Sequence, residues 1–131
     1  MDAGRLREQV RSRLAEQRAL VESLLRLKEQ LPGSLFARYG QCGKETCVCR
    51  RGEKHGPYFV LSTRSGGKGG FAYLAPAEAD EARGLVARHR AFREGLRRLK
   101  KVNEQLVVLL RRYQQAMARQ GERHMGLLAR P

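Results

Sequence analysis

The chain carries all three of its cysteines in one stretch, CGKETCVC (Cys42–Cys49), and HGPY (His55–Tyr58) follows it after a short gap. The spacing is Cys-x4-Cys-x-Cys-x5-His. Three thiolates and one imidazole are the ligand set of a closed, four-coordinate zinc site. We therefore predict a structural Zn²⁺ site formed by four side chains: Cys42, Cys47, Cys49 and His55.

The residues around these ligands favour a metal site. Gly43 allows a tight backbone turn, and Gly52 and Gly56 give the backbone conformational freedom where the chain returns from the cysteines. Nearby cations help to keep thiols deprotonated, and four of them surround the cluster: Lys44, Arg50, Arg51 and Lys54. Two other uses of clustered thiols stay open, a redox switch and an iron–sulfur cluster. A disulfide framework is disfavoured because the number of cysteines is odd and no apolar secretory segment is present.

The motif also resembles a known family signature. This is the pattern GSL…Y…CGK..C.C..G..HGPY, found between two helical segments in small bacterial and archaeal proteins without an assigned activity. Some of those proteins are encoded near transposase or integrase genes. The resemblance covers residues 33–75 in motif, where GSL (Gly33–Leu35), CGK (Cys42–Lys44) and HGPY match. It implies metal binding at the cysteines and His55, and it suggests a connection with mobile DNA.

Residues 33–75 have the composition of strands and turns. Three short runs are rich in aromatic and β-branched residues, which is typical of strands: Leu35–Tyr39, Tyr58–Arg64 and Phe71–Leu74. A glycine-rich turn, residues 65–70, connects the last two. Because a sheet of two or three strands is marginally stable alone, we predict an antiparallel β-meander stabilised by zinc. Structural zinc contributes on the order of 10 kcal/mol of apparent folding free energy.

Amphipathic helices flank this element. Residues 5–31 carry apolar side chains at three- and four-residue spacings, and Pro32-Gly33 ends that helix. From residue 76 to about residue 120, apolar positions alternate four and three residues apart, which is the heptad pattern of a coiled coil. The members of this stripe are Leu85, His89, Phe92, Leu96, Leu99, Asn103, Leu106, Leu110, Tyr113 and Met117.

The predicted fold class is therefore α+β. The two helices form a long antiparallel, coiled-coil-like hairpin, and the zinc-stabilised β-meander is inserted between them. We expect a single domain over residues 1–131, with a helix at 5–31, the zinc/β element at 33–75, a long helix at 76–120 and a flexible tail at 121–131.

The charge of the chain predicts a polyanionic partner. Lysine and arginine number 27 against 13 acidic residues, giving a net charge of +14. A domain this basic attracts nucleic acid. Between Arg83 and Lys101 there are eight cations and one acid, Glu94, whereas a merely solvated helix face usually mixes the two signs.

We therefore predict nucleic-acid binding by three groups of cations. They are Lys44, Arg50, Arg51 and Lys54 around the metal; Arg64 and Lys68 at the glycine-rich turn; and Arg83, Arg90, Arg93, Arg97 and Lys101 on the long helix. For Arg64 and Lys68 a solvated turn is the alternative. Duplex DNA is favoured over RNA and over unpaired strands, because few exposed aromatic rings are expected for stacking on bases.

Two further classes of function were weighed. A protein–protein adaptor is the first, since the distal half of the long helix, Leu106 to Met117, extends past its partner and would need a second copy or another protein to cover it. An enzyme is not predicted, because Glu45 and Glu53 are the only carboxylates near the metal motif and neither lies in a recognisable arrangement. No apolar run reaches the ~18 residues of a membrane span, and the expected location is cytoplasmic.

Overall fold

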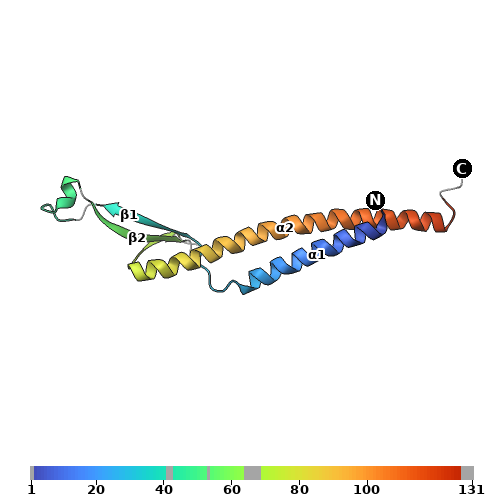
Figure 1. Cartoon of the computed structure of the whole chain (residues 1–131). Helices are drawn as coiled ribbons and strands as arrows, with labels where there is room; N and C mark the ends of the chain where they lie inside the picture. The colour runs from blue at the N-terminus through green and yellow to red at the C-terminus, as the bar shows by residue number, and fades with distance from the viewer. Residues whose placement is uncertain (1, 41–42, 53, 64–68, 128–131) are drawn as a thin grey trace. The chain divides into compact units, whose positions relative to one another are not determined.

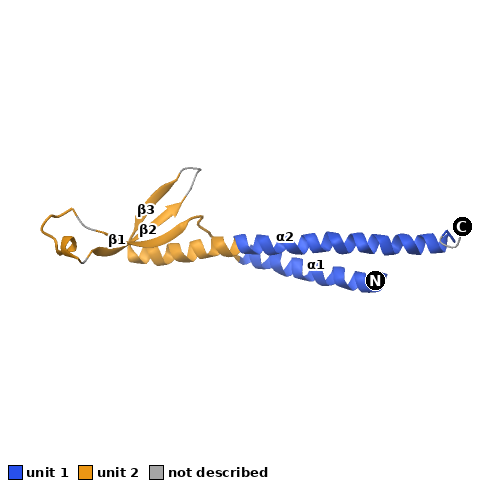
Figure 2. Ribbon diagram, turned by 90° about the horizontal axis from the view of Figure 1, so that it is seen from above, with its two compact units in different colours: residues 1–26, 93–131 blue, residues 27–92 orange. Residues whose placement is uncertain are grey.

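The computed structural model describes residues 2–40, 43–52, 54–63 and 69–127 (Figure 1). Its elements are, in order, α1 (Ala3–Arg26), β1 (Ser34–Gly40), the short 3-10 helix η1 (Val48–Arg51), β2 (His55–Thr63), β3 (Gly70–Leu74) and α2 (Pro76–His124). The predicted α+β class, with a small antiparallel sheet between two helices, is confirmed. The chain divides into two compact units, residues 1–26 with 93–131 and residues 27–92 (Figure 2).

Unit 1, residues 1–26 with 93–131, is an antiparallel helix pair. Three hydrogen bonds join side chains of α1 to side chains of α2. Donors that come later in α1 have acceptors that come earlier in α2, as is expected for antiparallel helices. The bonds run from Arg7 to Tyr113 (3.1 Å), from Arg13 to Gln105 (3.2 Å) and from Gln17 to Asn103 (2.7 Å). Leu6, Leu24, Val102 and Leu106 are buried in this unit.

The packed side of α2 in unit 1 differs from the predicted stripe at every second position. Leu99, Leu106 and Tyr113 are buried or half-buried as predicted. The alternate members, Leu96, Asn103, Leu110 and Met117, are exposed, and the residues one position earlier pack instead: Gly95, Val102, Leu109 and Ala116. Two apolar rows lie side by side on this helix, and the heptad pattern does not distinguish them.

A close approach of the two helices explains this choice of row. Any Cβ placed on Gly95 would collide with the side chain of Leu24. Because glycine has no side chain, it lets the buried Leu24 of α1 lie directly against α2. The larger Leu96 next to it is turned to solvent, with 48% of its surface exposed.

The ends of both helices also differ from the predicted bounds. Helix α1 ends at Arg26 rather than residue 31. Pro32 disfavours a helical conformation at Leu31, and the Leu31 amide donates to the Leu85 carbonyl at 3.1 Å. Helix α2 continues to His124, so it includes residues 121–124 of the predicted tail. It ends where Gly126, at φ +71°, and the amide of Leu127 satisfy the last carbonyls.

Unit 2, residues 27–92, holds a three-stranded antiparallel sheet in the order β1-β2-β3. Leu35, Leu61 and Ala72 form one cross-strand row, and Phe36, Val60 and Tyr73 form the next, on the opposite face. On the Leu61 face, Leu35, Phe59 and Leu74 are also at least half-buried.

Helix α2 supplies the partner of this face within unit 2. Ala79, Ala82 and Val86 are its buried residues there. Thr63, which points to the Leu61 face, donates from Oγ1 to the Pro32 carbonyl at 2.8 Å. The residue before Pro32 is Leu31, whose amide donates to the Leu85 carbonyl of α2. The Leu61 face is therefore linked to α2 through residues 31 and 32, and we infer that α2 packs on this face.

Candidate metal centre

The predicted metal motif lies at one end of the β1–β2 hairpin. Gly40 and His55 are the last paired residues of the two strands, so the segment between them forms the connecting loop (Figure 1). Within it, the Cys47 amide donates to the Lys44 carbonyl at 3.3 Å, and the Arg50 amide donates to the Cys47 carbonyl at 3.2 Å. These turns begin η1 and place Cys47 and Cys49 on the same side as His55.

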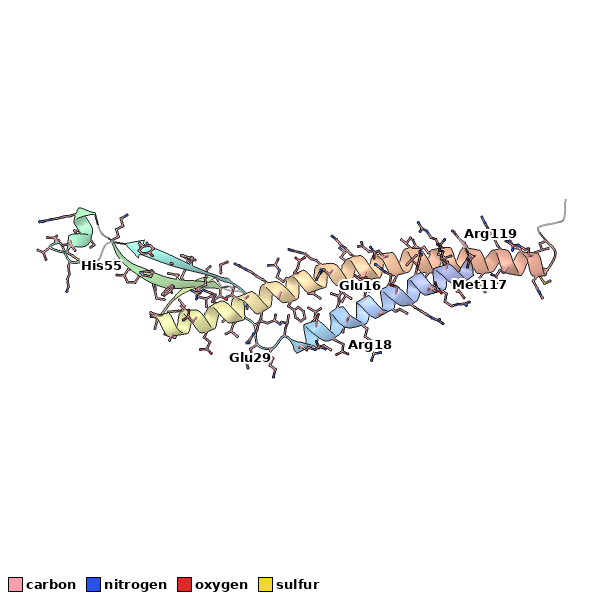
Figure 3. All side chains as sticks on the ribbon, viewed as in Figure 1. Glu16, Arg18, Glu29, His55, Met117 and Arg119 are labelled. Atoms are coloured by element: carbon pink, nitrogen blue, oxygen red, sulfur yellow. The ribbon has the colours of Figure 1, made fainter. Side chains whose placement is uncertain are left out.

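Three donor atoms meet in this loop. The two thiol sulfurs of Cys47 and Cys49 and a ring nitrogen of His55 all lie within 4.8 Å of one another. The sulfur of Cys47 and Nε2 of His55 are 2.8 Å apart. Cys49 is only 1% exposed, and Cys47 and His55 are half-buried. Figure 3 labels His55 at the junction of β2 and the loop. Among the described residues, this is the one group of three or more such side chains able to bind a metal ion.

The backbone fixes the histidine through its neighbour Gly56. Gly56 has φ +142°, and a Cβ at this position would lie 2.8 Å from both the Arg38 carbonyl oxygen and Cδ1 of Tyr39. Only glycine fits there, so β1 and β2 can close together directly behind His55. Gly52 also has a positive φ, +145°, where η1 ends.

The chain bends at Gly43, as predicted for the glycine beside the first cysteine. Nothing lies within 4 Å of a Cβ built on it. The positive φ values that favour glycine lie on the return side of the loop, at Gly52 and Gly56.

The three donor atoms lie close enough together to bind a metal ion. Zinc binds sulfur at about 2.3 Å and imidazole nitrogen at about 2.0–2.1 Å, which places neighbouring ligand atoms roughly 3.5–4 Å apart. The three donor atoms of Cys47, Cys49 and His55 all lie within 4.8 Å of one another, and the 2.8 Å between the Cys47 sulfur and Nε2 of His55 is shorter than that range. Cys42, the fourth predicted ligand, lies outside the described residues. Three of the four predicted ligands are thus brought together as a candidate metal site.

The predicted cations are exposed wherever the structure describes them. Lys44, Arg50, Arg51 and Lys54 lie around the metal loop, and Arg83, Arg90, Arg93, Arg97 and Lys101 lie on α2. Arg64 and Lys68 are outside the described residues. Arg83 pairs with Asp80 at 2.6 Å and Arg97 with Glu94 at 3.4 Å, both in solvent, where such pairs contribute little to stability. Arg90, Arg93 and Lys101 form no ion pair with any described residue.

The expectation of few exposed aromatic rings is wrong. Of the eight phenylalanines and tyrosines in the chain, five are exposed: Phe36, Tyr39, Tyr58, Phe71 and Tyr73. All five belong to the sheet of unit 2. The sequence signal was present in the alternation along the three strands, but the face to which each ring points depends on the register between strands.

Neither helix, over the part of the chain that the structure describes, has an apolar segment sufficient to cross a bilayer. No curated protein and no solved structure matches the chain. A family model does match residues 5–84, and it is described as Domain of unknown function (DUF6788). The matched region contains α1 from its third residue onward, the whole sheet, the first residues of α2 and the three metal-site residues. Since the match spans more than half of the 131 residues, the chain belongs to this family, the Domain of unknown function (DUF6788).

Proposed function

We propose that the protein binds nucleic acid through cationic surfaces and that a zinc ion stabilises its β-element. The observation that carries the proposal is the solvent-facing side of α2. Arg90, Arg93 and Lys101 lie there without ion-pair partners among the described residues, in a chain of net charge +14. Unpaired cations on a rigid helix are suited to contacts with phosphate, which bind nucleic acid without reading its sequence.

The donor set supports zinc as the metal. Two thiolates and an imidazole are soft and borderline ligands, which favour zinc over magnesium or calcium. Cys47, Cys49 and His55 would hold the ion, with Cys42 as the proposed fourth ligand. The cluster includes no carboxylate among the described residues, so no general acid or base is supplied beside it. We therefore assign the ion a structural role and propose no enzymatic activity.

Charge reversal on α2 tests the nucleic-acid proposal. The variant Arg90→Glu/Arg93→Glu/Lys101→Glu should bind duplex DNA much more weakly than the wild type. Because each lost phosphate contact lowers the slope of log affinity against log salt by about one, the slope should fall by about three. Fluorescence anisotropy with a labelled duplex, titrated at several salt concentrations, measures both quantities.

A matched control separates the surface from the total charge. Arg11, Arg18 and Arg26 are exposed cations of α1 without ion pairs among the described residues. Reversing them to Glu lowers the net charge from +14 to +8, the same change as in the α2 variant, and should weaken binding far less. Equal losses in the two variants would show that only the total charge matters and would reject α2 as the contact surface.

An adaptor or dimer function is the second candidate, and one exposed apolar face favours it. Leu96 and Leu110 lie seven residues before and after Asn103, and both are 48% exposed. Asn103 accepts a hydrogen bond from Gln17 of α1, and Leu14 and Val21, three residues before and four after Gln17, are exposed beside it. Both helices of unit 1 thus present apolar side chains on one side.

A second copy of this chain is the occupant that we propose for this face. A helix of 24 residues is about 36 Å long, and a pair of helices is roughly 20 Å wide, so the face offers about 700 Å² per copy. This approaches the ~800 Å² per partner of a stable interface. Sedimentation should show a dimer that Leu96→Glu/Leu110→Glu converts to monomer, while Val108→Glu, on the Gln105 side of α2, leaves it intact. A wild-type monomer at high concentration would exclude self-association.

A further inference from the structure

An open aromatic surface covers one face of the sheet in unit 2. Alternate residues of a strand share a face, and the strand register places six side chains together on the side opposite Leu61, next to the small Ser34 and Ser62. They are Phe36 and Arg38 of β1, Tyr58 and Val60 of β2, and Phe71 and Tyr73 of β3. We call this set the aromatic face.

The rings of the aromatic face are presented to solvent. Phe71 is 72% and Tyr73 66% exposed, and Phe36 and Tyr58 are each 43% exposed. Val60, between its cross-strand neighbours Phe36 and Tyr73, is only 3% exposed. The rings therefore form the outer surface of this face and cover the one aliphatic residue in it. Burying four rings against α2 would have been the ordinary outcome for a small protein, but α2 packs on the other face.

A cation is built into this surface. Nη1 of Arg38 donates to the hydroxyl of Tyr73 at 3.4 Å, which holds the guanidinium beside the ring. Arg38, Gly40, Tyr58 and Tyr73 line a shallow depression at this point. Apart from the covered Val60, the aromatic face offers rings, hydroxyls and a guanidinium, a composition that suits flat polar ligands better than a lipid or an aliphatic protein surface.

More cations lie where the aromatic face meets the metal loop. Arg50, Arg51 and Lys54 are exposed, and Lys54 directly precedes the first residue of β2. At about 3.3 Å per residue, Tyr58 is roughly 10–13 Å from the loop along the strand. Rings that accept stacked bases, with cations beside them to contact phosphate, are the two components of a surface that binds unpaired nucleic acid.

We propose that the aromatic face binds single-stranded nucleic acid by stacking unpaired bases on its rings. This inference rests on the proposed function for the general affinity of the chain for nucleic acid, and it assigns a second, distinct surface to that function. From the Phe71–Ser62 pair to the Arg38–Tyr58 pair, the face extends over four residue steps along β2, or about 13 Å. This length accommodates two or three bases, as on other antiparallel sheets that stack RNA.

Paired substitutions that remove or retain the rings test the proposal. Phe71→Leu/Tyr73→Leu keeps two apolar side chains but removes both rings. It should bind labelled oligothymidylate and oligouridylate at least about 30-fold more weakly than the wild type, since each stacked ring contributes substantially. Phe71→Tyr/Tyr73→Phe retains both rings and should bind within about twofold of the wild type. The affinity for a duplex of the same length should be unchanged in both variants.

Photo-crosslinking gives an independent readout. An oligonucleotide that contains 5-iodouracil should crosslink to the peptides that carry Tyr58 or Phe71–Tyr73, as mapped by mass spectrometry. Crosslinks confined to α2 would overturn the proposal, as would unchanged single-strand affinity in the leucine variant. Equal losses for the single strand and the duplex would also overturn it, because they would indicate a general effect on folding. If the leucine variant changed the oligomeric state of the protein and not its affinity for nucleic acid, the aromatic face would be a protein–protein surface and the proposal would be overturned.

Binding of the wild type and the leucine variant to both single strands and the duplex separates this inference from the proposed function. If the wild type binds single strands but not the duplex, the duplex contact on α2 is rejected and the aromatic face stands. If the wild type binds the duplex while the leucine variant loses nothing on single strands, the aromatic face is rejected and the α2 surface stands. Absence of binding to either nucleic acid rejects both.

Discussion

At the scale of single residues, Gly56 is the position on which the metal site depends most strictly. Its φ of +142° is rarely adopted by residues with a side chain, and the nearest obstacle to a Cβ is the backbone oxygen of Arg38, which cannot rotate away. The next residue back is His55, a proposed ligand. A change at Gly56 should therefore be transmitted directly to the geometry of the metal site.

We predict that Gly56→Ala lowers the free energy of unfolding by about 1–3 kcal/mol, the usual cost of a strained backbone conformation, and weakens zinc binding. Urea unfolding followed by tyrosine fluorescence and competition with a chromophoric chelator measure the two effects. Gly43→Ala is the matched control in the same loop, since a Cβ there meets nothing within 4 Å. A zinc affinity equal to that of the wild type in Gly56→Ala would contradict a role for Gly56 in seating His55.

At the scale of elements, local patterns predicted most of the structure. The strands, the loop that brings Cys47, Cys49 and His55 together, and the start of α2 at Pro76 all follow from residues near one another in the chain. The packed row of α2 could not be predicted in the same way, because Gly95 and Leu24, which are 71 positions apart in the sequence, decide it jointly. The apolar residues Leu96 and Leu110 complete a heptad pattern that the packing of α2 against α1 does not follow.

The aromatic face was missed for a related reason. Each strand shows alternation, but the exposed side is known only when β1, β2 and β3 are in register and α2 covers one face. The preference for duplex DNA rests on the expectation that few aromatic rings are exposed, in a chain with only eight of them. Composition measures how many rings exist, whereas recognition depends on how many point to solvent together.

At the scale of the whole molecule, the two compact units have separate small cores. Unit 1 buries Leu6, Leu24, Val102 and Leu106, and none of these is near the metal motif in sequence. Unit 2 buries Val60, Leu61 and three residues of α2, together with Cys49, which is itself a proposed ligand. The core that includes a proposed metal ligand should be destabilised when the metal is removed, while the other core should not.

We therefore predict that chelation of zinc unfolds the sheet of unit 2 and leaves the helix pair of unit 1 folded. Hydrogen exchange followed by mass spectrometry should show faster exchange in residues 34–63 after treatment with chelator, with unchanged protection in α1. Far-ultraviolet circular dichroism should retain most of its helical signal, because α1 and α2 contain 24 and 49 residues. Added zinc should restore protection of the sheet.

Cys47→Ser is the matching variant for this experiment, since it removes one proposed ligand without any chelator present. Its sheet should exchange rapidly from the outset and respond to neither chelator nor zinc, because the remaining donors bind the metal too weakly. If α1 lost protection together with the sheet, the two units would fold as one. If the sheet kept its protection in both experiments while the thiols oxidised reversibly, Cys47 and Cys49 would belong to a redox switch rather than to a structural zinc site.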